Sequence, residues 1–138
     1  MKEVNTYLSF DGDCRRAMLF YQQCFGYELQ LNTYPDAQGQ PSSDPGARIM
    51  HSQLLRSGEL ILMASDTPQV GSLRPGNNFS VSIQCDSVGE IERLFAALGQ
   101  NGQIRMPLGD TPWGARFGML TDQFGIQWIL NCNLLKQS

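Results

Sequence analysis

The sequence holds 138 residues with a formal net charge of −3, and 41% of them are hydrophobic while 17% are charged. Such a composition is typical of one globular domain, or of two small halves that share a core. The acidic balance excludes a surface for nucleic acid or acidic lipid, and no apolar run reaches the roughly 18 residues that span a membrane. The amino terminus, MKEVNTYLSF, lacks the long apolar segment of a secretion signal, so we expect a cytoplasmic protein with no membrane partner.

The four cysteines are Cys14, Cys24, Cys85 and Cys132. In a secreted chain this even count would indicate two disulfides. Here no two of them form a CxxC pair, and Cys24 and Cys85 fall within periodic apolar patterns. We therefore expect reduced, partly buried thiols.

The first part of the chain predicts a strand, a helix and a second strand. Residues 4–10 alternate between a polar and an apolar face, as a half-buried strand does. Asp13 is the expected N-cap of a helix over residues 14–25, whose apolar positions follow helical spacing. Gly26 should end that helix, and residues 28–34 alternate again as a second strand.

Residues 35–46 contain three prolines and two glycines and predict a loop. Residues 48–56 predict a third strand, which presents His51 and Gln53 on the same face. A turn at Ser57, Gly58 and Glu59 leads to a fourth strand over residues 60–65.

The second half begins after residues 66–77, a segment rich in Pro and Gly and the best candidate for an internal boundary. Residues 78–85 predict a strand with Ser80 and Ser82 on its polar face. The pattern S-x-x-E at residues 87–90 predicts a capping box that opens an amphipathic helix.

The last part of the chain predicts three more strands. A short strand near residues 103–106 precedes a loop of Gly, Pro and Trp over residues 107–114. Residues 116–131 then predict two strands joined by a tight turn at Asp122 and Gly125. The many apolar residues of this hairpin place it in the core, with Trp128 expected to be a core side chain.

The two halves share the order strand, helix and three strands, which indicates an internal repeat. Each half opens on a strand with one polar face, and each helix ends at glycines. A single module of this kind leaves one face of its sheet uncovered, so two modules must pair. The predicted fold class is α+β, built from two βαβββ modules.

Three stretches together resemble a known family: YLSFDGDCRRAMLFYQQCFG (7–26), MHSQLLRSGELILMASD (50–66) and WGARFGMLTDQFGIQWILN (113–131). The chain resembles the PhnB-like branch of the vicinal oxygen chelate superfamily, which also holds glyoxalase I, the extradiol dioxygenases and the bleomycin-resistance proteins. The resemblance implies a curved, barrel-like mixed sheet around a central cleft, and a homodimer. It also implies a single glyoxalase-like domain over residues 1–138, with module one at about 3–66, a linker at about 67–77 and module two at about 78–134.

Metal-dependent relatives take four ligands from the first and last strands of each module. By strand register, the resemblance places these positions at Asn5, Met63, Ser80 and Ile129. A hard divalent ion needs carboxylates or imidazoles, and methionine and isoleucine offer neither. We therefore expect no metal and no cofactor, which disfavours glyoxalase or dioxygenase chemistry.

His51 is the only histidine in the sequence. It is either a general base or hydrogen-bond donor that lines the cleft, or a core histidine bonded to a neighbouring strand. No nucleophile–base pair, carboxylate pair or phosphate-binding loop accompanies it, so the sequence identifies no catalytic residue.

Neutral polar side chains on the predicted strand faces, with aromatic residues nearby, suit a small ligand that is partly aromatic or carries an amide. Alternatively, these faces pack on each other or on a dimer partner. The candidate ligand-binding residues are Asn5, Tyr7, Ser9, His51, Gln53, Ser80, Ser82, Trp113, Phe117 and Gln127.

The leading hypothesis is a metal-free, small-molecule binding protein of the glyoxalase and bleomycin-resistance type. One alternative is a metal-dependent lyase, isomerase or dioxygenase of the same superfamily. Another is an accessory protein that acts through its dimer surface. The sequence does not name the ligand.

Overall fold

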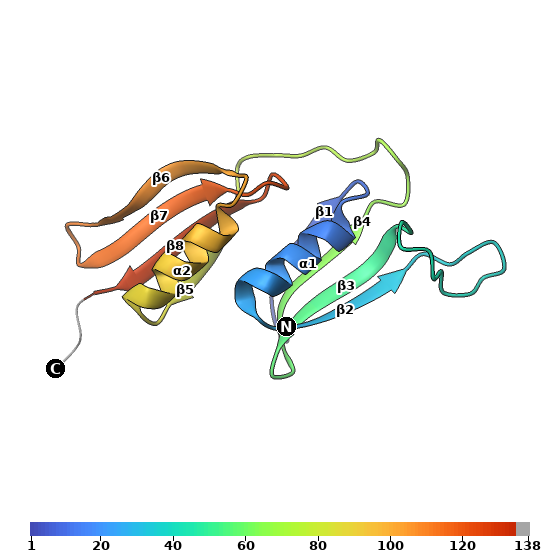
Figure 1. Cartoon of the computed structure of the whole chain (residues 1–138), viewed down its shortest axis with the longest axis horizontal. Coiled ribbons are helices and arrows are strands. Elements are labelled where there is room, and N and C mark those ends of the chain that lie inside the picture. The colour runs from blue at the N-terminus through green and yellow to red at the C-terminus, as the bar shows by residue number, and fades with distance from the viewer. Residues whose placement is uncertain (135–138) are drawn as a thin grey trace. The chain divides into compact units, whose positions relative to one another are not determined.

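The computed structural model describes residues 1–134 and forms two compact units, of which the first is Met1–Pro75 and the second begins at Gly76. The division between them falls inside the segment predicted as a linker. The first unit contains β1 (Tyr7–Phe10), α1 (Cys14–Phe25), β2 (Glu28–Thr33), β3 (Ile49–Arg56) and β4 (Glu59–Asp66) (Figure 1). The second contains β5 (Val81–Cys85), α2 (Val88–Leu98), β6 (Gln103–Asp110), β7 (Ala115–Thr121) and β8 (Gln127–Asn133).

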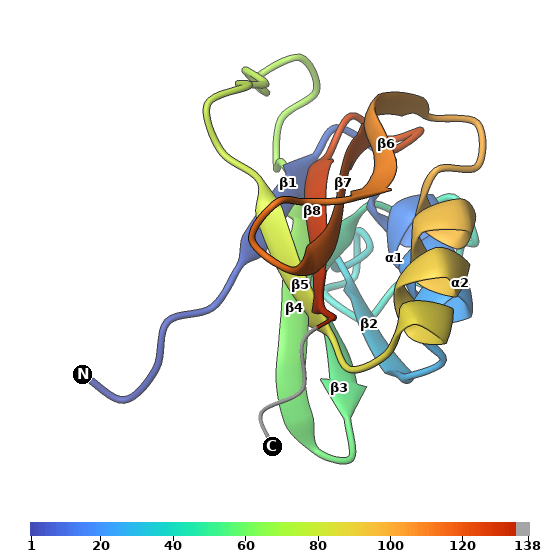
Figure 2. The same ribbon diagram turned by 90° about the vertical axis from the view of Figure 1, so that its left-hand side faces the viewer.

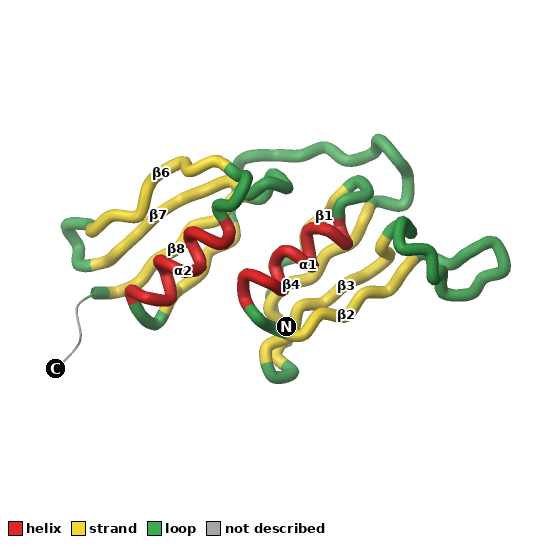
Figure 3. The backbone as a smooth tube through the Cα atoms, viewed as in Figure 1, coloured by secondary structure: helices red, strands yellow, loops and turns green. Residues whose placement is uncertain are grey.

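Each unit carries one open, four-stranded mixed sheet, and the two sheets have the same topology. The strand orders are β1-β4-β3-β2 and β5-β8-β7-β6, as the strands drawn in yellow in Figure 3 show. In each sheet the first and last strands of the module pair in parallel, and the other pairs are antiparallel. The predicted α+β class and the repeated βαβββ order are therefore confirmed. Closure of the sheets around a central cleft stays a prediction.

In the first unit, α1 covers one face of the sheet and packs on β2, β3 and β4 (Figure 2). Leu8 and Phe10 of β1 are buried, whereas Tyr7 and Ser9 between them are exposed. This alternation follows from the period of two in a strand, which directs successive side chains to opposite faces. The core of the unit lies between the helix and the sheet, and the opposite face is left open. The side chains of α1 that are buried in this core are Cys14, Ala17, Met18, Tyr21 and Cys24.

In the second unit, α2 packs on β5, β7 and β8. Trp128 is buried, as predicted for a core residue. Gly118 permits close packing here, because a Cβ added to it would lie only 2.7 Å from the ring of Phe95. The helix contributes the buried side chains Ile91, Leu94, Phe95 and Leu98.

The two helices begin with different caps. At α2 the predicted Ser87 cap is present, because the Glu90 N–H donates to Ser87 Oγ at 3.1 Å; Glu90 Oε1 accepts from the N–H of Asp86, one residue before the cap, at 2.8 Å. At α1, Asp13 occupies the N-cap position as predicted, but its side chain makes no capping hydrogen bond and pairs with Arg16 instead. Gly26 ends α1 in the left-handed conformation, as predicted.

Three predicted strand boundaries are wrong. The first strand begins at Tyr7 rather than residue 4, and the strand after the linker begins at Val81 rather than residue 78. β6 continues to Asp110 through Pro107, which the sequence placed in a loop. An edge strand tolerates proline, because an edge backbone nitrogen needs no hydrogen bond, and two register shifts in β6 absorb the irregularity.

The carboxylate of Asp66, at the end of β4, supplies the cap that Asp13 does not. Asp66 is 1% exposed, and its Oδ1 accepts from the N–H groups of Gly12 at 2.7 Å and Cys14 at 3.0 Å. Its Oδ2 accepts from the N–H of Ile49 at 2.8 Å. One side chain therefore joins the β1–α1 turn, the first residue of α1 and the start of β3.

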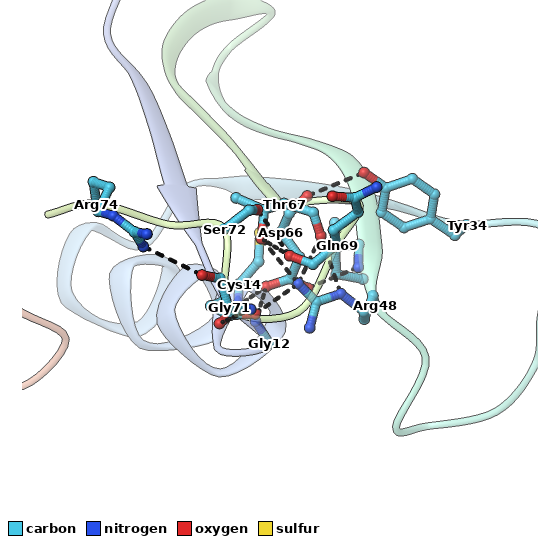
Figure 4. Close-up of polar contacts among 12 residues, drawn as sticks. Gly12, Cys14, Tyr34, Arg48, Asp66, Thr67, Gln69, Gly71, Ser72 and Arg74 are labelled. Carbon is cyan, nitrogen blue, oxygen red and sulfur yellow. Dashed lines mark hydrogen bonds and ion pairs between the residues drawn. The ribbon is translucent and has the colours of Figure 1, made fainter.

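A second set of contacts surrounds this carboxylate (Figure 4). The Arg48 guanidinium donates to Asp11 at 2.9 Å and to the carbonyl oxygen of Thr67 at 2.6 Å. The hydrogen bond from the Gly71 N–H, and then the Arg48 guanidinium, lower the pKa of Asp11. These contacts fasten the segment after β4 to the end of β1.

Replacing the Asp66 carboxylate should destabilise the protein more than replacing any exposed acid. In Asp66→Asn one carboxylate oxygen becomes an amide NH₂, which cannot accept from the buried N–H groups. We expect the free energy of unfolding to fall by about 3 kcal/mol, measured by urea denaturation. The matched control is Asp13→Asn, which removes only an exposed ion pair and should cost less than about 0.5 kcal/mol. Equal losses in the two variants would contradict this role for Asp66.

Candidate functional site

The open face of the first unit's sheet gathers four of the predicted ligand-binding residues: Tyr7, Ser9, His51 and Gln53. On β3, His51 and Gln53 are half-buried, whereas Ser52 and Leu54 are buried toward α1. On β1, Tyr7 is 46% exposed. The alternation of both strands therefore directs these four side chains to the side of the sheet that the helix does not cover.

Strand register sets which of these side chains are neighbours. Tyr7 lies beside Met63, and Met63 lies beside Gln53. Gln53 in turn lies beside Gln30 on β2, which makes a row across all four strands. A second row runs parallel to the first, and its pairs are Ser9 with Ser65 and His51 with Asn32.

The two rows are joined by a hydrogen-bonded chain of Tyr7, His51 and Gln53. Tyr7 Oη lies 3.1 Å from His51 Nδ1, and Gln53 Nε2 lies 3.0 Å from His51 Nε2. The Tyr7 and His51 ring centroids are 5.8 Å apart, with the ring planes tilted by 31°. This arrangement argues against the alternative in which His51 is a core residue, because both of its ring nitrogens bind side chains on the open face.

The two contacts connect the three side chains but leave the direction of each hydrogen bond to the His51 tautomer. Tyr7 Oη and His51 Nδ1 are both able to donate, and which of them does so depends on the ring nitrogen that carries the proton. The same is true of His51 Nε2 and the Gln53 amide. The open face therefore presents a tyrosine hydroxyl whose position is held by His51.

On the second unit's sheet, Ser82, Phe117 and Gln127 lie on the face away from α2. Phe117 is paired with Asn131, and Ser82 with Ile129. Gln127 donates through Nε2 to the carbonyl oxygen of Phe79 at 2.7 Å, which already engages its amide. These three candidates thus share an open face of their own unit.

The other predicted site residues lie outside the strands. Asn5 precedes β1, Ser80 precedes β5, and all three of Asn5, Ser80 and Trp113 are exposed. Trp113 lies in the turn between β6 and β7 and is 70% exposed. Asn5 and Ser80 were placed on polar strand faces because the predicted strands began three residues too early.

Sequence reasoning missed several side chains on these faces. Gln30 and Asn32 were assigned to a strand, but nothing in their alternation distinguished the open face from the covered one. Asn131 continues the alternation of Gln127 and Ile129 along β8, and its Nδ2 donates to Gln84 Oε1 at 2.9 Å. Extending the period of two to the end of β8 would have identified Asn131.

Comparison with known proteins places this geometry in a family. Residues 3–130 match the Glyoxalase/Bleomycin resistance protein/Dioxygenase superfamily. The chain belongs to this superfamily.

The chain is similar to three relatives along most of its length. It is 31% identical to protein YjdN of Escherichia coli strain K12, over 93% of both chains. It is 38% identical to PA1353 of Pseudomonas aeruginosa, whose crystal structure matches with a TM-score of 0.81 over 96% of this chain and 98% of that one. A PhnB protein from Bacillus cereus matches with 27% identity and a TM-score of 0.77, over 95% of this chain and 99% of that one. The predicted resemblance to the PhnB-like branch is confirmed.

The residues at the superfamily's ligand positions do not fit a hard divalent ion. Met63 and Ile129 lie on the open faces, and neither side chain has an oxygen or nitrogen. Asn5 and Ser80 offer only neutral oxygens from outside the strands. Within residues 1–134 no group of three or more His, Cys, Asp or Glu side chains could hold a metal.

The buried carboxylates of this chain accept hydrogen bonds mainly from backbone N–H groups. Asp122 is 3% exposed, and its Oδ1 accepts from the N–H groups of Phe124 at 2.8 Å and Ile126 at 3.0 Å. Its Oδ2 accepts from Trp128 Nε1 at 2.8 Å. Asp122 is therefore the turn-forming acid that the sequence predicts, whereas Asp66 accepts from backbone N–H groups that are distant in the chain.

The cysteines supply no activated nucleophile. All four are free and buried. Burial raises the pKa of the Cys14 thiol to about 12, against a weaker opposing effect of the Ser52 hydroxyl at 3.6 Å. Burial also raises the pKa of Cys85 to about 11, with a further contribution from Glu90. A thiol with a raised pKa is a poor nucleophile near neutral pH.

Among the described residues, no helix combines the length and apolar character that crossing a bilayer demands. The helices α1 and α2 have 12 and 11 residues.

The raised pKa of Cys14 makes stability depend on alkaline pH. The unfolded thiol ionises near its ordinary value of 9.0, whereas the folded thiol stays protonated up to about 12. The stabilising effect is therefore complete below pH 9 and is lost as the pH rises toward 12. Between pH 8 and pH 10 the wild type should lose about 1 kcal/mol more stability than Cys14→Ala, by urea denaturation at each pH.

Two results would count against this account of the thiols. Parallel pH profiles for the wild type and Cys14→Ala would show that Cys14 does not titrate on unfolding. Thiol titration of denatured, non-reduced protein should find four thiols, and a smaller number would reveal a disulfide.

Proposed function

We propose that the protein is a small-molecule binding protein of the glyoxalase and bleomycin-resistance type, which holds a neutral ligand without a metal. The binding surface is the open face of the first unit's sheet. The observation that carries the proposal is the hydrogen-bonded chain of Tyr7, His51 and Gln53. It holds the Tyr7 hydroxyl in position before any ligand arrives, which lowers the entropic cost of binding.

The character of this face favours an uncharged ligand. Both rows consist of neutral side chains, with Met63 as an apolar surface between Tyr7 and Gln53. A charged ligand would lose hydration there without gaining an opposite charge. A ligand with a carbonyl or amide acceptor and a small apolar or aromatic part would bind Tyr7 Oη and lie against Met63.

The ligand donors at hand also support metal-free binding. His51 is the one imidazole in the sequence, and both of its ring nitrogens already have side-chain partners. A metal would have to displace one of these contacts and find its remaining ligands among neutral groups. For this reason we place binding ahead of lyase, isomerase or dioxygenase chemistry. We also propose that the protein is cytoplasmic and that it forms a homodimer, the assembly that the family resemblance implies.

A thermal-shift screen with neutral metabolites and antibiotics, with and without EDTA, tests this function. A ligand bound only by the folded protein raises the melting temperature, and EDTA should change neither that shift nor the melting temperature itself. Tyr7→Phe removes the hydroxyl and should weaken binding about tenfold, because it deletes one hydrogen bond and releases His51. The matched control is Tyr27→Phe, which lies outside the two rows and should bind as the wild type does.

Three outcomes would overturn the proposal. Stoichiometric metal that survives dialysis, with loss of binding on its removal, would indicate the metal-dependent enzyme. Equal binding by Tyr7→Phe and Tyr27→Phe would exclude the Tyr7 chain as the site. A screen without any hit would favour an accessory protein that acts through its dimer surface.

A further inference from the structure

A recess also lies in the first unit, lined by residues of α1, β2, the loop that joins β2 to β3, and β3. Its volume is about 690 Å³, large enough for a small organic molecule. None of Tyr7, His51 and Gln53 lines it, but Asn32 of the second open-face row does, so the recess adjoins the open-face site at β2. Its lining residues are Arg15, Leu31, Asn32, Thr33, Pro35, Gly39, Pro41, Ser42, Ser43, Asp44, Pro45 and Met50.

The loop wall of this recess is built by specific hydrogen bonds. The Thr33 hydroxyl donates to the carbonyl oxygen of Ser42 and accepts from the Ser42 N–H, both at 3.1 Å. Pro35 and Pro41 form an isolated antiparallel bridge. Asp36 Oδ1 accepts from two N–H groups of the turn between them. The recess therefore has a defined outer wall.

Arg15 differs from the other arginines of its unit. Its Nε is buried and has no hydrogen-bond partner among the described residues. Arg16, Arg48 and Arg56 each pair with a carboxylate, and Arg74 donates to backbone carbonyls. Nε itself is shielded, so an anion in the recess would meet the rest of the guanidinium, whose charge is paired with no carboxylate among the described residues.

The groups that line the recess limit which kind of anion could bind there. A guanidinium binds a carboxylate or phosphate through two parallel N–H groups. Asp44 is also in the lining, and its carboxylate accepts from the Gly46 N–H at 2.9 Å rather than from Arg15. The Asp44 carboxylate adds a negative charge to the recess, and this charge would repel a doubly charged phosphate more than a singly charged carboxylate. Leu31, Met50 and the prolines offer apolar surface to the rest of such a molecule.

We propose that this recess binds a small organic monocarboxylate, with its carboxylate on Arg15 and its apolar part against Leu31 and Met50. The inference goes beyond the open-face function, because it concerns a charged ligand and rests on Arg15 rather than on Tyr7 and His51. The two sites share Asn32, but each has its own test variant.

The test is a titration of ¹⁵N-labelled protein with benzoate, following the Arg15 Nε–H signal by NMR at constant ionic strength. We expect a saturable shift of this signal. Arg15→Gln should weaken benzoate binding, followed through backbone amides of β2, by about tenfold or more, since a charge-assisted hydrogen bond is lost. The matched control is Arg16→Gln, the neighbouring exposed arginine, which should bind within about twofold of the wild type.

Further arms separate the alternatives. Benzamide, which has the shape of benzoate without its charge, should leave the Arg15 signal unmoved, and inorganic phosphate should bind more weakly than benzoate. Equal shifts with benzamide, tighter binding of phosphate, or equal losses in Arg15→Gln and Arg16→Gln would each overturn the proposal. It would also fail if Asp44→Asn were required before benzoate bound, because Arg15 would then pair with Asp44 in solution.

Discussion

The buried carboxylate of Asp66 holds together the parts of the first unit on which its open face depends. Burying a charge costs several kcal/mol, and here backbone N–H groups of Gly12, Cys14 and Ile49 offset that cost. The positive end of the α1 dipole adds to the effect, since Cys14 is the first helical residue. Because Asp66 ends β4, the same contacts hold β1 parallel to β4 and set Ile49 at the start of β3. Tyr7 and His51 reach hydrogen-bonding distance only in this register.

Local patterns in the sequence account for most of the fold. Alternation with a period of two predicted which faces of β1 and β3 are buried, and the S-x-x-E pattern predicted the cap of α2. The cap of α1 was missed because Asp66 is 52 residues from Cys14, and no local pattern reports a partner at that distance. β6 was cut short at Pro107 because edge position, which makes proline tolerable there, follows from sheet order rather than from the strand itself.

The candidate site likewise has a part that local sequence patterns predict and a part that they do not. Tyr7, Ser9, His51 and Gln53 share a face because each strand alternates, so the sequence could place them together. The bond between Tyr7 and His51 depends on two strand pairings, β1 with β4 and β4 with β3, whose registers the sequence does not specify. Arg15 was not predicted as a site residue because only the apolar positions of α1 were informative in the sequence. The lack of a partner for its Nε can be seen only in the folded unit, with the loop of residues 34–48 in place.

The first unit therefore offers two surfaces of different chemistry. The open face is neutral, with a tyrosine hydroxyl held by His51 and a central methionine, whereas the recess beside α1 has a cation and apolar walls. The superfamily fold supports many chemistries, so function here must be argued from these side chains rather than from the fold.

Amide hydrogen exchange at the three backbone N–H groups on Asp66 tests the central claim most directly. If the carboxylate holds them as described, the amides of Gly12, Cys14 and Ile49 should exchange as slowly as the core amides of β3 and β4. The three amides should also exchange at similar rates, because one side chain protects all of them. Exchange at these positions as fast as in the exposed segment of residues 69–74 would contradict the account.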